Sequence, residues 1–277
     1  MVNMLLIPYI KKHYENKKGD FNMNVNEKDM PTINISIRDY YHGIDNTKIA
    51  SGGESIICTL GEDEKLYKFF IDPRNPELTI DMPANKIRKV QALYKMHPKY
   101  MTTPTALISI GSCVVGYEMP RFLDSTTFYK AGLSLPEKIE ALSKTRDILK
   151  YFATLGITYG DIKSNNILID SNGNISFCDV DNVQVKTYPI DLVVEFLKLF
   201  SEKYGKIDEN ADAYMHNIFT LQQLGFPNST PTYREIVKTV ESGIYPKAFE
   251  KEAYPIFESM KTPENFNGEY IIQYVKK

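Results

Sequence analysis

Hydrophobic and polar residues alternate over residues 32–37, which is the pattern of a half-buried β-strand. Four further segments are rich in β-forming residues and also predict strands: residues 55–60, 65–71, 105–110 and 112–119. The turn residues Gly61-Glu62-Asp63-Glu64 separate the second segment from the third and predict a hairpin, and Gly111 separates the last two. We therefore expect a five-stranded, β-rich part of the chain.

Within this part, one stretch has the apolar spacing of a helix instead. Ile87, Val90 and Tyr94 recur at helical intervals. Asp81 can cap the helix and Pro83 suits its first turn. The β-rich part is thus expected to contain one helix.

After Pro120 the pattern becomes mainly helical. Ser134-Leu135-Pro136-Glu137 is a capping box, and an apolar stripe follows it up to Gly156. Residues 166–170 and 174–178 predict a second hairpin, and helical patterns dominate from residue 190 to the end.

The simplest organisation is two lobes joined near residues 118–124. We expect an N-terminal extension over residues 1–45, which are polar and rich in lysine and asparagine, a β-rich lobe over residues 46–118 and a helical lobe over residues 119–277.

The composition is that of a globular protein, with 277 residues, 43% hydrophobic and 25% charged. Lys and Arg number 33 against 35 Asp and Glu, so the chain has no basic excess for nucleic acid or a membrane surface. The three cysteines form no metal or disulfide pattern. We expect a cytoplasmic protein without a signal peptide, a membrane span or a nucleic-acid partner.

Four polar residues carry the chemistry of the chain. Asp161, Lys163 and Asn166 follow the long helix, and the hairpin after them delivers Asp179 at a strand end. Phosphoryl transfer needs this set, because one carboxylate must meet the acceptor hydroxyl while other oxygens hold a divalent metal against the phosphates.

The segments GDIKSNNILID and FCDVD resemble the HRDxKxxN catalytic loop and the DFG metal-binding segment of the protein-kinase superfamily. The resemblance covers roughly residues 46–260 and implies a two-lobed α+β kinase-like fold that binds ATP and Mg²⁺ between its lobes. It makes Asp161 the catalytic base, Lys163 the residue that steadies the phosphate, and Asn166 and Asp179 the Mg²⁺ ligands.

The resemblance extends to the nucleotide-binding residues. Residues 49–55 resemble a shortened glycine-rich loop, in which Gly52 and Gly53 would cradle the phosphates. Lys68 falls where the family has its phosphate-pairing lysine, with Lys65 as the alternative.

Two more segments match the family. Gly116-Tyr117-Glu118-Met119-Pro120-Arg121 resembles the connection between kinase lobes, where the adenine would bond to backbone near Tyr117 and Met119. Asp212 resembles the aspartate that braces the catalytic loop through backbone N–H groups, and Asp191 is a rival for that role.

The chain also departs from the family pattern. No glutamate lies between Asp81 and His97 to pair with Lys68, and no Ala-Pro-Glu segment follows the metal aspartate. Gly160 stands where an arginine receives a phosphorylated activation loop, so activity is expected to be independent of such phosphorylation. Asp181 stands where the family has glycine; it can bind Mg²⁺ or point to solvent, and we expect it to be a further Mg²⁺ ligand.

These features favour a Ser/Thr protein kinase, a transferase acting on a protein substrate. One alternative is a pseudokinase, a nucleotide-binding scaffold that regulates a partner protein. Another is a small-molecule kinase, in which a sugar or aminoglycoside-like hydroxyl replaces the peptide.

Overall fold

The computed structural model describes residues 29–61, 64–72, 75–185, 188–189, 200–201, 205, 207–224, 235–236, 238 and 242. Over these residues the chain is an α+β protein that forms two compact units. One unit contains the residues up to Met82 together with Thr105–Glu118. The other contains Pro83–Pro104 together with the residues from Met119 onward.

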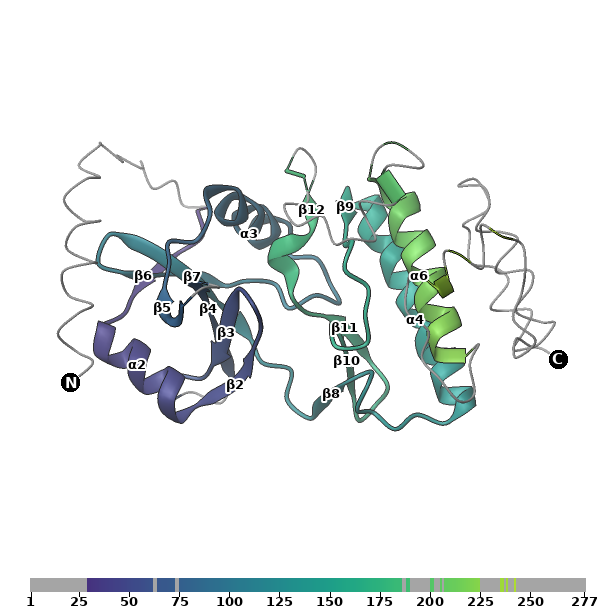
Figure 1. Cartoon of the computed structure of the whole chain (residues 1–277), viewed down its shortest axis with the longest axis horizontal. Coiled ribbons are helices and arrows are strands. Elements are labelled where there is room, and N and C mark those ends of the chain that lie inside the picture. Colours follow the sequence, from purple (N-terminus) through teal and green to yellow (C-terminus); the bar gives the residue numbers. More distant parts are fainter. Residues whose placement is uncertain are drawn as a thin grey trace. The chain divides into compact units, whose positions relative to one another are not determined.

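A seven-stranded mixed sheet forms the first unit (Figure 1). Its strands are β1 (Thr32–Asn34), β2 (Lys48–Ser51), β3 (Ser55–Cys58), β4 (Lys65–Asp72), β5 (Asn75–Thr79), β6 (Ala106–Ile110) and β7 (Cys113–Pro120). The order is β1-β6-β7-β4-β3-β2, and β5 also pairs with β4. Strands β1 and β6 are parallel, whereas the pairs β2–β3, β3–β4, β4–β5 and β6–β7 are antiparallel. The hairpin predicted around residues 61–64 and the two strands predicted around Gly111 are confirmed, but the predicted strand count misses β2 and β5.

The first unit also contains a helix that the sequence pattern did not predict, α2 (Ile37–Asn46). Ser36 and Asp39 form a capping box, in which the Asp39 N–H donates to Ser36 Oγ at 3.1 Å and the Ser36 N–H donates to Asp39 Oδ2 at 3.3 Å. The strand predicted over residues 32–37 therefore ends at Asn34. Part of the expected N-terminal extension belongs to this unit.

Helix α2 packs closely against the sheet. The Tyr40 ring is buried edge-on against Phe69, with ring centroids 5.0 Å apart. A Cβ atom at Gly43 would lie 2.4 Å from Leu60 Cδ2, so a larger residue here would have to displace the end of the Leu60 side chain. Packing thus stabilises a helix whose own sequence includes an unfavourable glycine.

The second unit is built from helices and two small sheets. Its described elements are α3 (Ala84–Met96), β8 (Ser125–Thr127), α4 (Leu135–Thr154), β9 (Ile157–Thr158), β10 (Ile167–Asp170), β11 (Ile175–Phe177), the 3₁₀ turn η2 (Val180–Asn182), β12 (Gln184–Val185) and α6 (Glu209–Leu224). Strands β11, β10 and β8 form one sheet, and β12 pairs with β9.

Two predictions for this unit are confirmed and one boundary differs. The capping box of α4 is present, with the Ser134 N–H donating to Glu137 Oε2 at 2.8 Å. Strands β10 and β11 form the predicted hairpin. Helix α3 begins after Pro83 without a side-chain cap, and it belongs to the second unit rather than to the β-rich lobe in which the sequence placed it.

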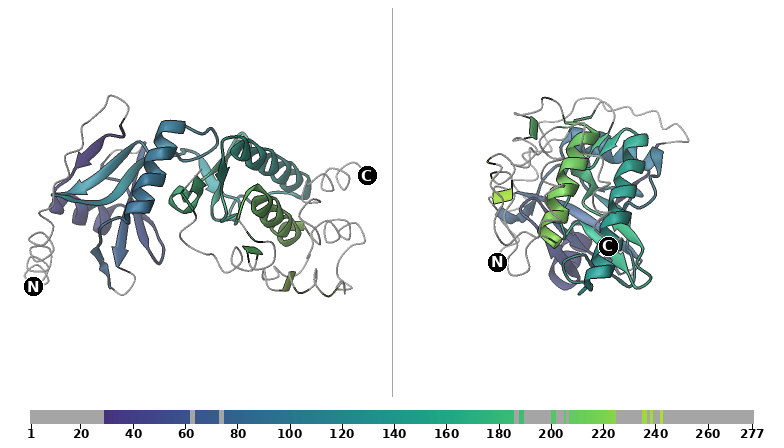
Figure 2. Two further views of the ribbon diagram at one scale, coloured as in Figure 1. Left: turned by 90° about the horizontal axis from the view of Figure 1, so that it is seen from above. Right: turned by 90° about the vertical axis from the view of Figure 1, so that its right-hand side faces the viewer.

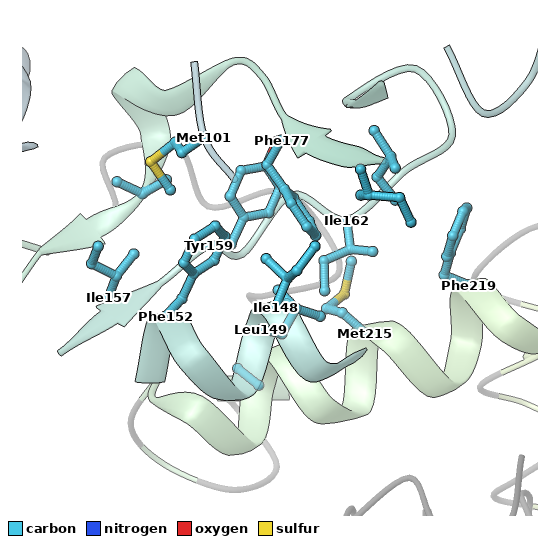
Figure 3. Close-up of a cluster of buried hydrophobic side chains, with 14 of the residues drawn as sticks. Met101, Ile148, Leu149, Phe152, Ile157, Tyr159, Ile162, Phe177, Met215 and Phe219 are labelled. Atoms are coloured by element: carbon cyan, nitrogen blue, oxygen red, sulfur yellow. The ribbon is translucent and has the colours of Figure 1, made fainter. Parts of the chain in front are cut away.

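Helices α4 and α6 lie side by side and supply much of the core of the second unit (Figure 2). Figure 3 shows Phe152 of α4 and Met215 of α6 in the same cluster as Phe177 of β11. His216 of α6 is also buried, and its Nε2 lies 2.9 Å from the Leu142 carbonyl oxygen of α4. This core supports the loop between β9 and β10.

The structure describes only some of the residues after residue 190. Helix α6 is described, whereas the other helical patterns predicted there lie mostly outside the described residues. Among the helices that are described, none is long and apolar enough to cross a membrane.

Candidate active site

The candidate catalytic loop, residues 159–166, connects β9 to β10 in the second unit. The chain reaches it from α4 through a tight reversal in which Gly156 has a φ of 71°. Ile162 of the loop is fully buried in the core (Figure 3), so the polar side chains around it rest on a packed base.

Asp212 of α6 fixes the start of this loop. Its Oδ2 accepts the backbone N–H of Tyr159 and its Oδ1 accepts that of Gly160, both at 2.7 Å. The Asp212 residue is only 3% exposed, and hydrogen bonds to a buried carboxylate are strong. The bracing role predicted for Asp212 is confirmed, whereas its rival Asp191 lies outside the described residues.

The backbone conformation at Gly160 favours glycine. Its φ is 77°, in the left-handed region that favours glycine. An arginine here would be strained, so the departure from the family pattern at Gly160 agrees with the local conformation.

Asp161, Lys163 and Asn166 lie together. Lys163 Nζ is 2.6 Å from Asp161 Oδ2, and Asn166 Nδ2 donates to the same oxygen at 2.8 Å. Asn166 Nδ2 also reaches the Asp161 backbone carbonyl at 3.0 Å. The Asp161 and Asn166 residues are buried, while the Lys163 side chain is 46% exposed. A carboxylate is thus oriented by an amide, with a partly exposed cation beside it.

The hairpin brings Asp179 next to this cluster along the backbone. The Cys178 N–H donates to the Asn166 carbonyl oxygen at 2.9 Å, which ties the end of β11 to the catalytic loop. Asp179 itself has a φ of 61° and a ψ of 55°. Such a conformation costs a non-glycine residue about 1–3 kcal/mol and tends to occur at functional sites.

Tyr159 links the same two segments through its side chain. Its ring packs on Phe177 with centroids 4.7 Å apart, and its hydroxyl donates to the Cys178 carbonyl oxygen. Burial, together with nearby Cys178 and Asp179, raises the Tyr159 pKa well above its ordinary value. The hydroxyl therefore remains a neutral donor.

Asp181 lies in a different environment from the one expected. It is 1% exposed, and its Oδ2 lies 2.9 Å from Lys86 Nζ of α3. The metal-ligand role of Asp181 stays a prediction, but one of its oxygens is engaged by a buried cation. Sequence reasoning missed Lys86, and the only signal for it was a lysine in the first turn of a helix.

The candidate phosphate-binding glycines lie in the first unit, in the turn between β2 and β3. The Gly52 N–H donates to the Ser55 carbonyl oxygen at 2.9 Å. A Cβ atom on Gly52 or Gly53 would meet no atom of the described residues within 4 Å. The described residues therefore do not demand glycine at either position, and the phosphate-binding role of Gly52 and Gly53 stays a prediction.

The two candidate lysines of β4 have different environments. Lys68 is 3% exposed, and its Nζ lies 5.7 Å from the Phe70 ring centroid and 5.8 Å from that of Tyr117. Lys65 is more exposed and pairs with Glu118 at 3.4 Å. Lys68 therefore lies among aromatic rings, whereas Lys65 takes part in a partly exposed ion pair.

The candidate connection between the lobes is a buried strand. Tyr117 of β7 pairs with Leu107 of β6, and both Tyr117 and Met119 are buried. A Cβ atom at Gly116 would lie 2.0 Å from the Lys68 carbonyl oxygen, so the approach of β7 to β4 requires glycine. The adenine-binding role of Tyr117 and Met119 stays a prediction.

The structure thus places the predicted residues in two sets. Gly52, Gly53, Lys68 and Tyr117 belong to the first unit, and Met119 with the Asp161 loop, Asp179 and Asp181 belongs to the second. Over the described part of the chain, no group of three or more His, Cys, Asp or Glu side chains is placed to hold a metal ion. The expected magnesium site instead combines an amide oxygen with carboxylates, which are ligands that Mg²⁺ accepts.

No protein-family model matches the chain, and no curated protein matches it.

Proposed function

We propose that the chain is an ATP- and Mg²⁺-dependent phosphotransferase that phosphorylates Ser or Thr hydroxyls of a protein. The observation that carries this proposal is the cluster of Asp161, Lys163 and Asn166, bonded through the backbone to the segment before Asp179. A buried carboxylate held by an amide and a lysine is suited to receive a hydroxyl proton next to a phosphoryl group.

In this proposal Asp161 accepts the proton of the attacking hydroxyl. The hydroxyl oxygen bonds to the γ-phosphorus of ATP, and the bond from that phosphorus to the β–γ bridging oxygen breaks, so ADP leaves with the electron pair. The positive charge of Lys163 stabilises the negative charge on the transferring phosphoryl group. Its side chain is partly exposed, so it can turn from Asp161 toward that group. Asn166 keeps the carboxylate of Asp161 directed at the hydroxyl.

The amide oxygen of Asn166 and the carboxylate of Asp179 would hold magnesium. The ion would neutralise part of the negative charge of the phosphates. The residues fit this role because Asn166 uses its nitrogen toward Asp161, which leaves its oxygen for a cation. Asp179 is held in a conformation that a non-glycine residue seldom adopts.

Turnover of ATP is the decisive measurement. The full chain with radiolabelled ATP and Mg²⁺ should label itself or a generic protein acceptor. Asp161→Asn, which preserves size and removes the base, should lower the rate by about a thousandfold. The catalytic proposal would be overturned by a thermal shift with ATP but no turnover, which would indicate a nucleotide-binding scaffold. If only small-molecule hydroxyls are labelled, the proposal that the acceptor is a protein would be overturned.

A further inference from the structure

A buried ion pair joins α3 to the turn that follows Asp179. Lys86 Nζ lies 2.9 Å from Asp181 Oδ2 and 3.0 Å from Asn182 Oδ1. The Lys86 residue is 5% exposed and Asp181 is 1% exposed. Two consecutive side chains of η2 therefore hold one ammonium group that comes from a helix 95 residues earlier.

The position of Lys86 in its helix is locally unfavourable. It is the third residue of α3, whose first turn contains no acidic residue. Cations are disfavoured at this end of a helix because the backbone N–H groups give it a partial positive charge. The interactions with η2 compensate for this placement.

The ion pair restricts the backbone of the residues that follow Asp179. Helix α3 packs against both η2 and β12. Val180, which separates Asp179 from Asp181, is fully buried in the core. With Val180 buried and the next two side chains bonded to Lys86, the residue before η2 has little freedom to leave its left-handed conformation.

We propose that Asp181 is a positioning residue that, paired with Lys86, holds Asp179 in place, and that Asp181 is not a magnesium ligand. The proposal rests on the proposed function, in which Asp179 holds the metal. For the oxygen of Asp181 that contacts Lys86 to bind a dication, the buried ammonium would have to give up its contact with that carboxylate oxygen, and a buried charge that loses its opposite charge is strongly unfavourable.

Hydrogen exchange of the ligand-free full chain tests the positioning itself. Lys86→Met keeps the length of the side chain and removes its charge, so amides of residues 178–185 should exchange about tenfold faster. Arg88→Met, which removes an exposed cation from the same helix, should leave exchange there unchanged. Exchange in Lys86→Met equal to that of the wild type would overturn the proposal.

Binding of Mn²⁺ together with a non-hydrolysable ATP analogue, followed by electron paramagnetic resonance, tests the ligand question. Asp181→Asn removes the carboxylate that compensates the positive charge of Lys86, so Mn²⁺ should bind about tenfold more weakly. The double variant Lys86→Met/Asp181→Asn leaves no uncompensated buried charge but still loses the pair that positions Asp179, so it should bind Mn²⁺ about threefold more weakly than the wild type.

Different results would overturn the positioning role of Asp181 and the proposed phosphotransferase function. A double variant as weak as Asp181→Asn would show that Asp181 itself is a ligand and would overturn this inference. A wild-type chain that binds neither Mn²⁺ nor the analogue would overturn the proposed function, and the exchange of residues 178–185 would still decide whether Lys86 fixes the segment. The neutral double variant also guards against a single variant that fails to fold.

Discussion

Asn166 holds Asp161 at two points, donating its side-chain amide to the backbone carbonyl at 3.0 Å and to carboxylate Oδ2 at 2.8 Å. Both bonds use the same nitrogen, so the amide oxygen remains for another partner. One side chain can therefore orient the proposed base and offer an oxygen to a cation. Its loss should affect both tasks.

Asn166→Ala should lower kcat of the phosphotransferase by about a hundredfold, because the carboxylate of Asp161 loses its fixed direction. It should also raise the Mg²⁺ concentration needed for half-maximal rate. Both are measured in a steady-state assay with Mg²⁺ varied. The neighbouring Asn165 is exposed, and Asn165→Ala should stay within about twofold of the wild type. Equal effects of the two substitutions would contradict the role of Asn166.

Asp212→Ala should destabilise the chain and impair activity together. Removing the carboxylate leaves the N–H groups of Tyr159 and Gly160 without their acceptors, and hydrogen bonds to charged groups contribute about 1.5–3 kcal/mol each. Thermal or denaturant unfolding measures the change. Glu140→Gln, on the exposed face of α4, should alter the free energy of unfolding by less than about 0.5 kcal/mol. An Asp212→Ala protein as stable as this control would refute the brace.

Activity should not depend on phosphorylation of the chain. Gly160 has no side chain to receive a phosphate, and its φ of 77° disfavours any residue that could. Phosphatase treatment, followed by removal of the phosphatase, should leave kcat within about twofold of the untreated protein. A large loss that is restored by incubation with ATP would contradict this expectation.

His216 should make the stability of the chain sensitive to acid. Burial between α4 and α6 lowers its pKa from 6.5 to about 4, against the opposing effect of the bond to Leu142. The unfolded chain therefore binds a proton between these values that the folded chain does not. The contribution is fully present above pH 6.5 and is lost as the pH falls toward 4.

His216→Gln should flatten this dependence. The free energy of unfolding of the wild type should fall between pH 6.5 and 4 by up to about 1.4 kcal/mol per pH unit more than that of the variant. Denaturant unfolding across this range measures both slopes. His42→Gln, at an exposed position on α2, should retain the slope of the wild type. Parallel curves for the wild type and His216→Gln would refute the buried, neutral histidine.

Local signals in the sequence predicted those elements in which pattern and packing agree. The capping box at Ser134 and the turn residues of the hairpins each act over a few residues, and the structure contains them. Helix α2 was missed because Gly43 and the neighbouring aromatic residues weaken its intrinsic preference, and it is the contact of Tyr40 with Phe69 that stabilises it. Such a contact depends on residues far apart in the chain.

The candidate site likewise has parts that local sequence signals predicted and parts that they did not. The spacing of Asp161, Lys163 and Asn166 lies within one loop, so the sequence predicted their proximity. The brace from Asp212 was predicted only through the family resemblance. The pairing of Lys86 with Asp181 could not be predicted, because it joins a helix and a turn through burial that no local pattern records.

The left-handed backbone conformation at Asp179 lowers the stability of the folded chain, but it keeps a carboxylate at this position. A glycine at residue 179 would adopt this φ of 61° without strain, and so would give a sturdier chain that lacks a carboxylate at that point. Replacing Asp179 by glycine should therefore raise the melting temperature of the chain while removing the carboxylate that the proposed function needs there.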